Sequence, residues 1–178
     1  MSALRLQQTV AGPTQVKGFG YWSGQDVCVE FCPAPPDSGI TFLRGDLAPA
    51  VQIPAVVANR VKMPRRTNLV AAGAQVEMVE HVLAALAGLG IDNCEVRVDA
   101  AEMPGCDGSA QAFVAALDEV GTVIQDVPCC PLVVEDVLRV GTDDAWIEAR
   151  PNAAGELSIK YELDYGTTSP IGRQSFEL

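Results

Sequence analysis

The pattern of apolar residues changes near Glu77, and this change limits the folds that the chain can adopt. Over roughly the first 60 residues apolar and polar positions alternate, which is typical of half-buried β-strands. After Glu77 the apolar positions follow a helical stripe, which comprises Val79, Val82, Leu83, Leu86 and Leu89. A Gly-Leu-Gly sequence ends this helix. The chain therefore combines short strands with at least one amphipathic helix.

The other patterns before residue 127 complete this fold. Alternation predicts strands around Gln8, Val29, Phe42 and Val96, and a further short strand over Ile53–Ala58. Ser109 is the predicted N-cap of a second helix, which Gly121 closes. The apolar positions of that helix are Phe113, Val114, Leu117 and Val120. We therefore predict an α+β fold over residues 1–126, a two-layer sandwich in which a small mixed sheet packs on two helices.

The strand pattern restarts after Pro131. Apolar and polar residues alternate in three stretches, Leu132–Val140, Trp146–Ala149 and Leu157–Leu163. No helical pattern follows them, so nothing in the sequence would cover the sheet. We predict that residues 127–178 are the incomplete start of a second domain, which would expose apolar surface and favour self-association.

The composition indicates a globular protein and excludes one class of partner. Apolar residues make up 48% of the chain, enough to form a core. The formal charge is −11, from 23 acidic and 12 basic residues, which argues against a nucleic-acid partner because such a partner normally requires a basic face. An anionic small molecule stays compatible with the sequence, because basic residues cluster locally at Arg60, Lys62, Arg65 and Arg66.

The sequence contains no recognisable targeting or membrane-spanning segment. The longest apolar run, around Leu83, is well short of the roughly 20 residues that a membrane span requires, and the N-terminus lacks the apolar stretch of a secretory signal. The six cysteines do not follow the spacing of a disulfide scaffold. Cys28 and Cys32 are better explained as one face of a strand than as half of a zinc site. We expect a cytoplasmic protein with reduced thiols.

The dipeptide Glu80–His81 is the first candidate for chemistry, and His81 is the only histidine in the sequence. At about 100° per residue both side chains lie off the apolar stripe, so neither is directed into the core. A zinc-binding imidazole beside a carboxylate that accepts a proton suits metal-assisted hydrolysis, and the small Ala84 and Gly88 would let a ligand or another domain approach. The simpler alternative is a solvated pair on a surface helix, in which Glu77 contacts His81.

The sequence supplies too few ligands for a complete zinc site. Catalytic zinc normally has three protein ligands, and the H-E-x-x-H pattern of metalloproteases is absent. Glu102 and Asp107 precede the second helix, where Asp107 and Ser109 are expected to satisfy free N–H groups, with any part in shaping a cleft secondary. The glycine-rich segment Lys17–Gly24 is predicted to be a bent strand and loop, because no helix start follows it.

Two long motifs closely resemble one known family. They are Val79–Asn93 (VEHVLAALAGLGIDN) and Glu102–Ser109 (EMPGCDGS). The shorter matches are Gly18-x-Gly20 with Ser23–Gly24, the turn Pro33–Gly39 and Arg66–Thr67. On these motifs nearly the whole chain resembles the UDP-3-O-acyl-N-acetylglucosamine deacetylase family of lipid A biosynthesis.

The resemblance implies a zinc-dependent hydrolase that removes acetate from a UDP-linked, acylated aminosugar. It also implies two similar domains, each a small sheet packed on two helices, with the active site between them. In that pattern His81 would match the first zinc ligand and Glu80 the general base. Trp22 stands where the family usually has a histidine near the substrate cleft. The family's other zinc ligands, from a H-x-x-x-D motif, and a further active-site histidine belong to a later part of its second domain.

Three interpretations follow from this resemblance. The chain is the N-terminal portion of such a deacetylase, truncated or engineered and inactive alone. Alternatively, it is one subunit of a split deacetylase, whose partner chain supplies the rest. The third interpretation is a non-catalytic binding or assembly module that keeps the fold without the chemistry.

Overall fold

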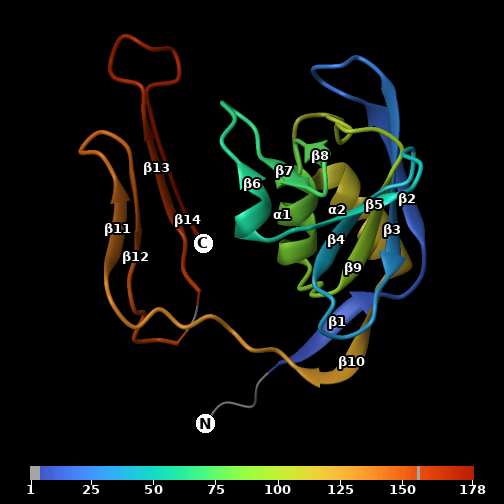
Figure 1. Cartoon of the computed structure of the whole chain (residues 1–178). Helices are drawn as coiled ribbons and strands as arrows, with labels where there is room; N and C mark the ends of the chain where they lie inside the picture. The colour runs from blue at the N-terminus through green and yellow to red at the C-terminus, as the bar shows by residue number, and fades with distance from the viewer. Residues whose placement is uncertain (1–4, 156) are drawn as a thin grey trace. The chain divides into compact units, whose positions relative to one another are not determined.

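The computed structural model describes residues 5–155 and 157–178, and the chain divides into two units, Met1–Cys130 and Pro131–Leu178 (Figure 1). The elements of the first unit are β1 (Leu6–Val10), β2 (Thr14–Phe19), β3 (Asp26–Pro33), β4 (Ile40–Arg44), β5 (Val51–Pro54), the 3₁₀ helix η1 (Val57–Asn59), β6 (Arg60–Val61), β7 (Asn68–Ala71), β8 (Ala74–Glu77), α1 (Glu80–Gly88), β9 (Cys94–Val98), α2 (Gln111–Val120) and β10 (Thr122–Pro128). The elements of the second unit are β11 (Leu138–Gly141), β12 (Trp146–Ala149), β13 (Lys160–Asp164) and β14 (Arg173–Glu177).

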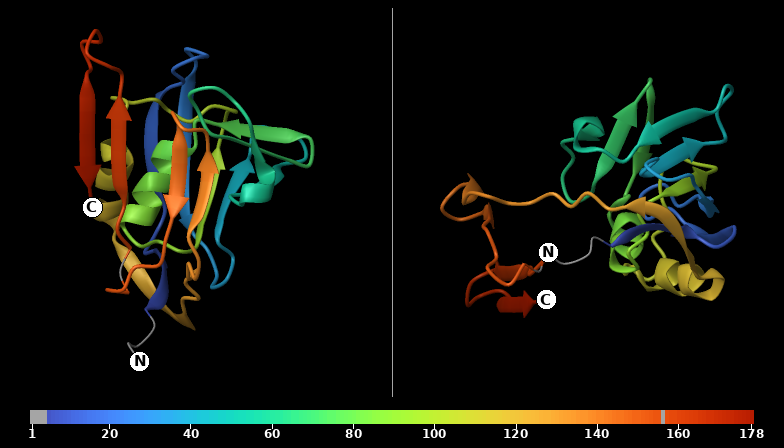
Figure 2. Two further views of the ribbon diagram at one scale, coloured as in Figure 1. Left: turned by 90° about the vertical axis from the view of Figure 1, so that its left-hand side faces the viewer. Right: turned by 90° about the horizontal axis from the view of Figure 1, so that it is seen from below.

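A five-stranded mixed sheet in the order β2-β3-β9-β4-β5 forms one layer of the first unit. β4 and β9 run parallel, and the other neighbouring strands run antiparallel. The inward residues of β3 and β9 are buried and lie side by side on one face of the sheet, Val29 paired with Val98 and Phe31 with Val96. Helices α1 and α2 cover this face of the sheet (Figures 1 and 2). The two-layer α+β arrangement confirms the predicted fold class.

The two helices contribute the second half of the core. α1 buries Val82, Ala85 and Leu86, and α2 buries Phe113 and Leu117. The Phe113 ring packs edge-on against Phe31, with 6.2 Å between the ring centroids. Complete burial stabilises each large apolar side chain by about 1.5–3 kcal/mol. Val79, Val82 and Leu86 of the predicted stripe are buried, whereas Leu83 and Leu89 are half-buried and Ala85 takes an inward position.

The start of α2 differs slightly from the prediction. Ala110 occupies the N-cap position in place of Ser109, and no side chain caps the helix there. Ser109 Oγ still accepts a hydrogen bond from the Gln111 N–H at 3.1 Å, so it satisfies one free donor from just outside the helix. Gly121, with a φ of 74°, closes α2 as predicted.

Two smaller sheets, β6-β7-β8 and β1-β10, complete the first unit. β7 and β8 form a hairpin that leads directly into α1. The predicted strand over Ile53–Ala58 is wrong after its first two residues, because β5 ends at Pro54 and η1 follows. The Asn59 side chain donates to the carbonyl of Pro54 at 2.8 Å, which closes this turn.

The second unit consists of two antiparallel hairpins, β11-β12 and β13-β14. β12 has the predicted bounds, but the first strand is shorter than predicted and β14 was not predicted, so the expected number of three strands is wrong. The described residues after Pro131 contain no helix. Whether residues 127–178 begin a second domain like the first stays a prediction. None of the helices in the described part of the chain is both long and apolar enough to span a membrane.

Candidate active site

The junction between β8 and α1 positions the candidate residues. The Glu77 N–H donates to the Ala101 carbonyl at 2.8 Å, and the Met103 N–H donates to the Glu77 carbonyl at 3.0 Å. These two bonds pair the end of β8 with the segment that follows β9. Met78 then adopts a φ of 58°, which turns the chain into the first residues of α1, Glu80 and His81.

The Glu80 carboxylate is oriented by the backbone of Thr67. Its Oε2 accepts the Thr67 N–H at 2.9 Å, and the Val79 N–H donates to the Thr67 carbonyl at 3.2 Å. The backbone N–H and carbonyl of one residue, Thr67, thus contact the Glu80 side chain and the start of α1. Glu80 is half-buried, in agreement with the prediction that it points away from the core.

His81 is half-buried next to Glu80, and its ring forms no hydrogen bond with any described residue. Asp107 lies close enough for the two side chains to interact electrostatically. Hydrogen bonds from the N–H and hydroxyl groups of Ser109 lower the pKa of Asp107, and the nearby His81 ring contributes in smaller part. Asp107 thus orders the turn before α2 through Ser109, as the sequence suggested.

The predicted contact between Glu77 and His81 is wrong. Glu77 is the last residue of β8 and not part of α1, so the helical spacing does not apply to it. Its carboxylate instead forms an ion pair with Arg66, with 2.8 Å between Oε2 and Nη1. Both side chains are largely buried, at 16% and 19% exposure, so this pair is poorly screened by solvent.

Glu102 has a role that the sequence did not reveal. It is 5% exposed, and its carboxylate accepts the N–H groups of Trp22 and Ser23 at 2.7 and 2.8 Å. Burial opposes ionisation, but these hydrogen bonds and the charge of Arg66 outweigh it, so the pKa of Glu102 is lowered. Glu102 therefore holds the loop after β2, whereas the groups expected to satisfy free N–H groups before α2 were Asp107 and Ser109. Its one sequence signal was Gly18-x-Gly20, since alternate glycines in a strand mark a close backbone approach.

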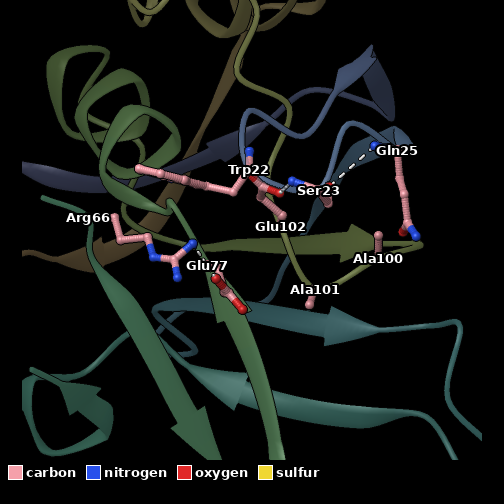
Figure 3. Close-up of a pocket in the computed structure, with 8 residues that line it drawn as sticks. All are labelled: Trp22, Ser23, Gln25, Arg66, Glu77, Ala100, Ala101 and Glu102. Carbon is pink, nitrogen blue, oxygen red and sulfur yellow. Dashed lines mark hydrogen bonds and ion pairs between the residues drawn. The ribbon is translucent and has the colours of Figure 1, made fainter. Parts of the chain in front are cut away.

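Glu77 and Glu102 line a pocket of about 250 Å³, whereas Glu80 and His81 are not among its lining residues (Figure 3). The pocket is lined by Trp22, Ser23, Gln25, Arg66, Glu77, Ala100, Ala101 and Glu102. Arg66 extends between Trp22 and Glu77, and its guanidinium carbon lies 5.3 Å from the centroid of the Trp22 ring. Arg66, one residue of the predicted basic cluster, therefore lines this pocket. The residue after it, Thr67, orients Glu80.

The donors in the described part of the chain do not make a complete zinc centre. No group of three or more His, Cys, Asp or Glu residues within 5–155 and 157–178 is arranged to hold a metal ion. Catalytic zinc normally requires three protein ligands. His81 has the chemistry of one such ligand, so these residues fit part of a zinc site.

The fold and the site together define a two-layer α+β domain with a carboxylate–imidazole pair at the start of a helix. Over residues 7–178 the chain matches LpxC, the UDP-3-O-acyl N-acetylglycosamine deacetylase family, and it belongs to this family. The family match confirms the resemblance inferred from the sequence motifs.

Several curated relatives carry the name UDP-3-O-acyl-N-acetylglucosamine deacetylase. The proteins of Psychrobacter arcticus and Psychrobacter cryohalolentis are each 40% identical over 159 residues, and that of Shewanella violacea is 38% identical over 165 residues. These matches cover 89%, 89% and 90% of this chain but 50%, 50% and 53% of the relatives. The chain spans about half the length of the curated relatives it matches.

Proposed function

We propose that this chain provides the general base and the first zinc ligand of a UDP-3-O-acyl-N-acetylglucosamine deacetylase. The observation that carries the proposal is the pair at the start of α1. There the Thr67 N–H fixes the Glu80 carboxylate, and the neighbouring His81 ring has no hydrogen-bond partner among the described residues. Membership of the deacetylase family supports this assignment. The substrate would be a UDP-linked, acylated aminosugar of lipid A biosynthesis.

The two side chains have separate tasks in this proposal. Glu80 accepts a proton from the water that attacks the acetamide carbonyl of the substrate, and the Thr67 N–H keeps the carboxylate in place. His81 is one ligand of zinc, which when bound would act as a Lewis acid. The sequence has no second histidine, so the H-x-x-x-D ligands of the family would come from residues that this chain does not contain. We therefore expect the chain alone to bind zinc well below one equivalent after dialysis.

A chimera tests the proposal directly. Residues 1–178 would replace the matching half of the Psychrobacter arcticus relative, and zinc content and deacetylation of the UDP-sugar would be measured. Glu80→Gln should keep zinc and fold but lower kcat by on the order of 10²–10⁴, as expected for loss of a general base. His81→Ala should lower both zinc content and rate, because it removes a ligand.

Glu95→Gln is the matched control. Glu95 is also a half-buried glutamate, but it lies on β9 and pairs with Arg97. Its substitution should leave zinc content and rate unchanged. Equal activity in Glu80→Gln and the parent chimera would remove the base assignment. Stoichiometric zinc in the isolated chain that is lost on His81→Ala would show that other ligands are present.

A further inference from the structure

The loop that follows β2 presents an exposed aromatic ring in a fixed environment. Trp22 is 56% exposed, yet its ring contacts both Arg66 and Tyr21. The guanidinium of Arg66 lies 5.3 Å from the ring centroid, and the Tyr21 ring meets it edge-on at 5.3 Å. Arg66 is itself held by the ion pair with Glu77. The attraction between the guanidinium and the ring face favours this contact.

Those ring contacts require a fixed backbone at Trp22, and Glu102 supplies it. The carboxylate bonds to two consecutive N–H groups of this loop, one with each oxygen. A buried carboxylate is costly unless it is fully hydrogen-bonded, so the loop and the charge stabilise each other. The pairing also crosses 79 and 80 residues of sequence, which ties the loop to the segment after β9.

The packing around Gly20 shows how tightly the loop closes on the carboxylate. A Cβ atom at Gly20 would collide with Ser23 Oγ and lie 2.5 Å from Glu102 Oε2. On the neighbouring segment, a Cβ at Gly105 would lie 3.3 Å from the Cβ of Tyr21. Glycine at both positions therefore leaves room for the loop to wrap around Glu102.

We propose that Glu102 is a positioning residue, which acts through the backbone of Trp22 and Ser23 to hold the Trp22 ring on Arg66 as one wall of the pocket. That this pocket belongs to the substrate cleft rests on the proposed function. The positioning itself does not, and it can be measured without substrate or activity.

Trp22 can be observed alone by fluorescence. The chain has two tryptophans, so Trp146→Phe leaves Trp22 as the single reporter. In this background we expect Glu102→Gln to raise the acrylamide quenching constant about twofold, because the ring loses its contact with the cation. The near-UV circular dichroism of the Tyr21–Trp22 pair should decrease, with an unchanged far-UV spectrum. Glu95→Gln, the control on β9, should match the parent.

A second pair of variants separates positioning from general destabilisation. Arg66→Gln alone should reproduce the rise in quenching, and the double variant Glu102→Gln/Arg66→Gln should show no further rise, since both act on one contact. Should Glu102→Gln not fold, Glu102→Asp tests the same point, because it keeps the charge but is one methylene too short to reach both N–H groups. Parent-level quenching in the folded Glu102 variant, or additive effects with Arg66→Gln, would overturn the proposal.

The two proposals can fail separately. A chimera without deacetylase activity would contradict the proposed function. The fluorescence quenching and near-UV circular dichroism of Trp22 would still test the role of Glu102. Unchanged Trp22 signals in an active chimera would remove the positioning role alone.

Discussion

Many large apolar side chains are buried in the first unit of the chain, whereas most of those in the second are exposed. In the first unit Phe31, Phe42 and Phe113 are completely buried. In the second, Phe176 is 63% exposed and Leu132 is 95% exposed. Both units contain strands with alternating apolar residues, so the strand pattern does not explain the difference. The first unit has two helices that cover its sheet, whereas the described part of the second has hairpins only.

This contrast shows what a layer of helices adds to a small sheet. An isolated two-stranded hairpin is marginally stable in water, and a sheet gains stability when its apolar face is covered. α1 and α2 provide this cover in the first unit through Leu86, Phe113 and Leu117. The exposed apolar side chains of the second unit agree with the expectation of self-association, which stays a prediction.

Hydrogen exchange should show the largest difference between the units. Amides of α1, α2 and β9 lie in the core of the first unit, so they should open only near the full free energy of unfolding, on the order of 5–15 kcal/mol. Amides of β11–β14 should exchange faster by several orders of magnitude, because few buried contacts oppose their opening. Mass spectrometry of exchanged peptides measures both. Equal protection in β9 and β13 would contradict the contrast.

A matched pair of phenylalanine substitutions tests the same contrast through stability. Phe113→Ala removes a fully buried ring that packs on Phe31, and it should lower the free energy of unfolding by about 3–5 kcal/mol. Phe176→Ala removes a largely exposed ring and should change it by less than about 0.5 kcal/mol. Urea titration followed by far-UV circular dichroism measures both. A similar loss in the two variants would mean that the second unit buries Phe176 in solution.

Acid should destabilise the first unit through three carboxylates. The pKa values of Asp46 and Asp92 are lowered mainly by hydrogen bonds from Arg44 and Arg5, and that of Glu102 is lowered by loop N–H groups despite burial. The unfolded chain therefore binds more protons near pH 4, so stability is present above the ordinary values of 3.8 and 4.5 and is lost as pH falls through the lowered ones.

We expect the free energy of unfolding to decrease by on the order of 1–3 kcal/mol between pH 6 and pH 3. Urea titrations across this range measure the loss, and Asp92→Asn should flatten the profile. In the second unit the pKa of Glu162 is lowered by Lys160, but this pair is exposed and screened by solvent. A stability that does not change with pH would contradict the importance of the three carboxylates.

The elements that the sequence predicted best are those in which local pattern and burial agree. The helix after Glu77, the strand around Val96 and the end of α2 at Gly121 were all found as predicted. These segments pack on one face, so a period of two or 3.6 residues is sufficient to identify them. β14 lacked such a signal because Phe176 is its only apolar residue, so no alternation is visible.

The candidate site was only partly predictable for a different reason. Glu80 and His81 stand out in sequence, whereas the partners of Glu77 and Glu102 are distant along the chain. Whether a glutamate near the start of a helix is exposed or buried depends on which distant segment of the chain packs against its side chain. For Glu102 that segment is the Trp22–Ser23 loop, and no local pattern encodes that pairing.

Two ion pairs provide the smallest test of the difference between the units. Arg44 is 10% exposed, donates to both oxygens of Asp46 and also donates to the Gln75 carbonyl at 2.6 Å, which links β4 to β8. Asp46→Asn should therefore lower the free energy of unfolding by about 1–2 kcal/mol, because a largely buried guanidinium loses its charged partner. Glu162→Gln removes the partner of Lys160, whose side chain is 60% exposed, and should have no measurable effect. Urea titration at low salt measures both variants, and a repeat at high salt should alter the small effects of exposed pairs more than the Asp46 effect.

If the two substitutions lowered the free energy of unfolding equally, solvent access would not explain the difference between the units. The second unit would then have to be as well packed in solution as the first.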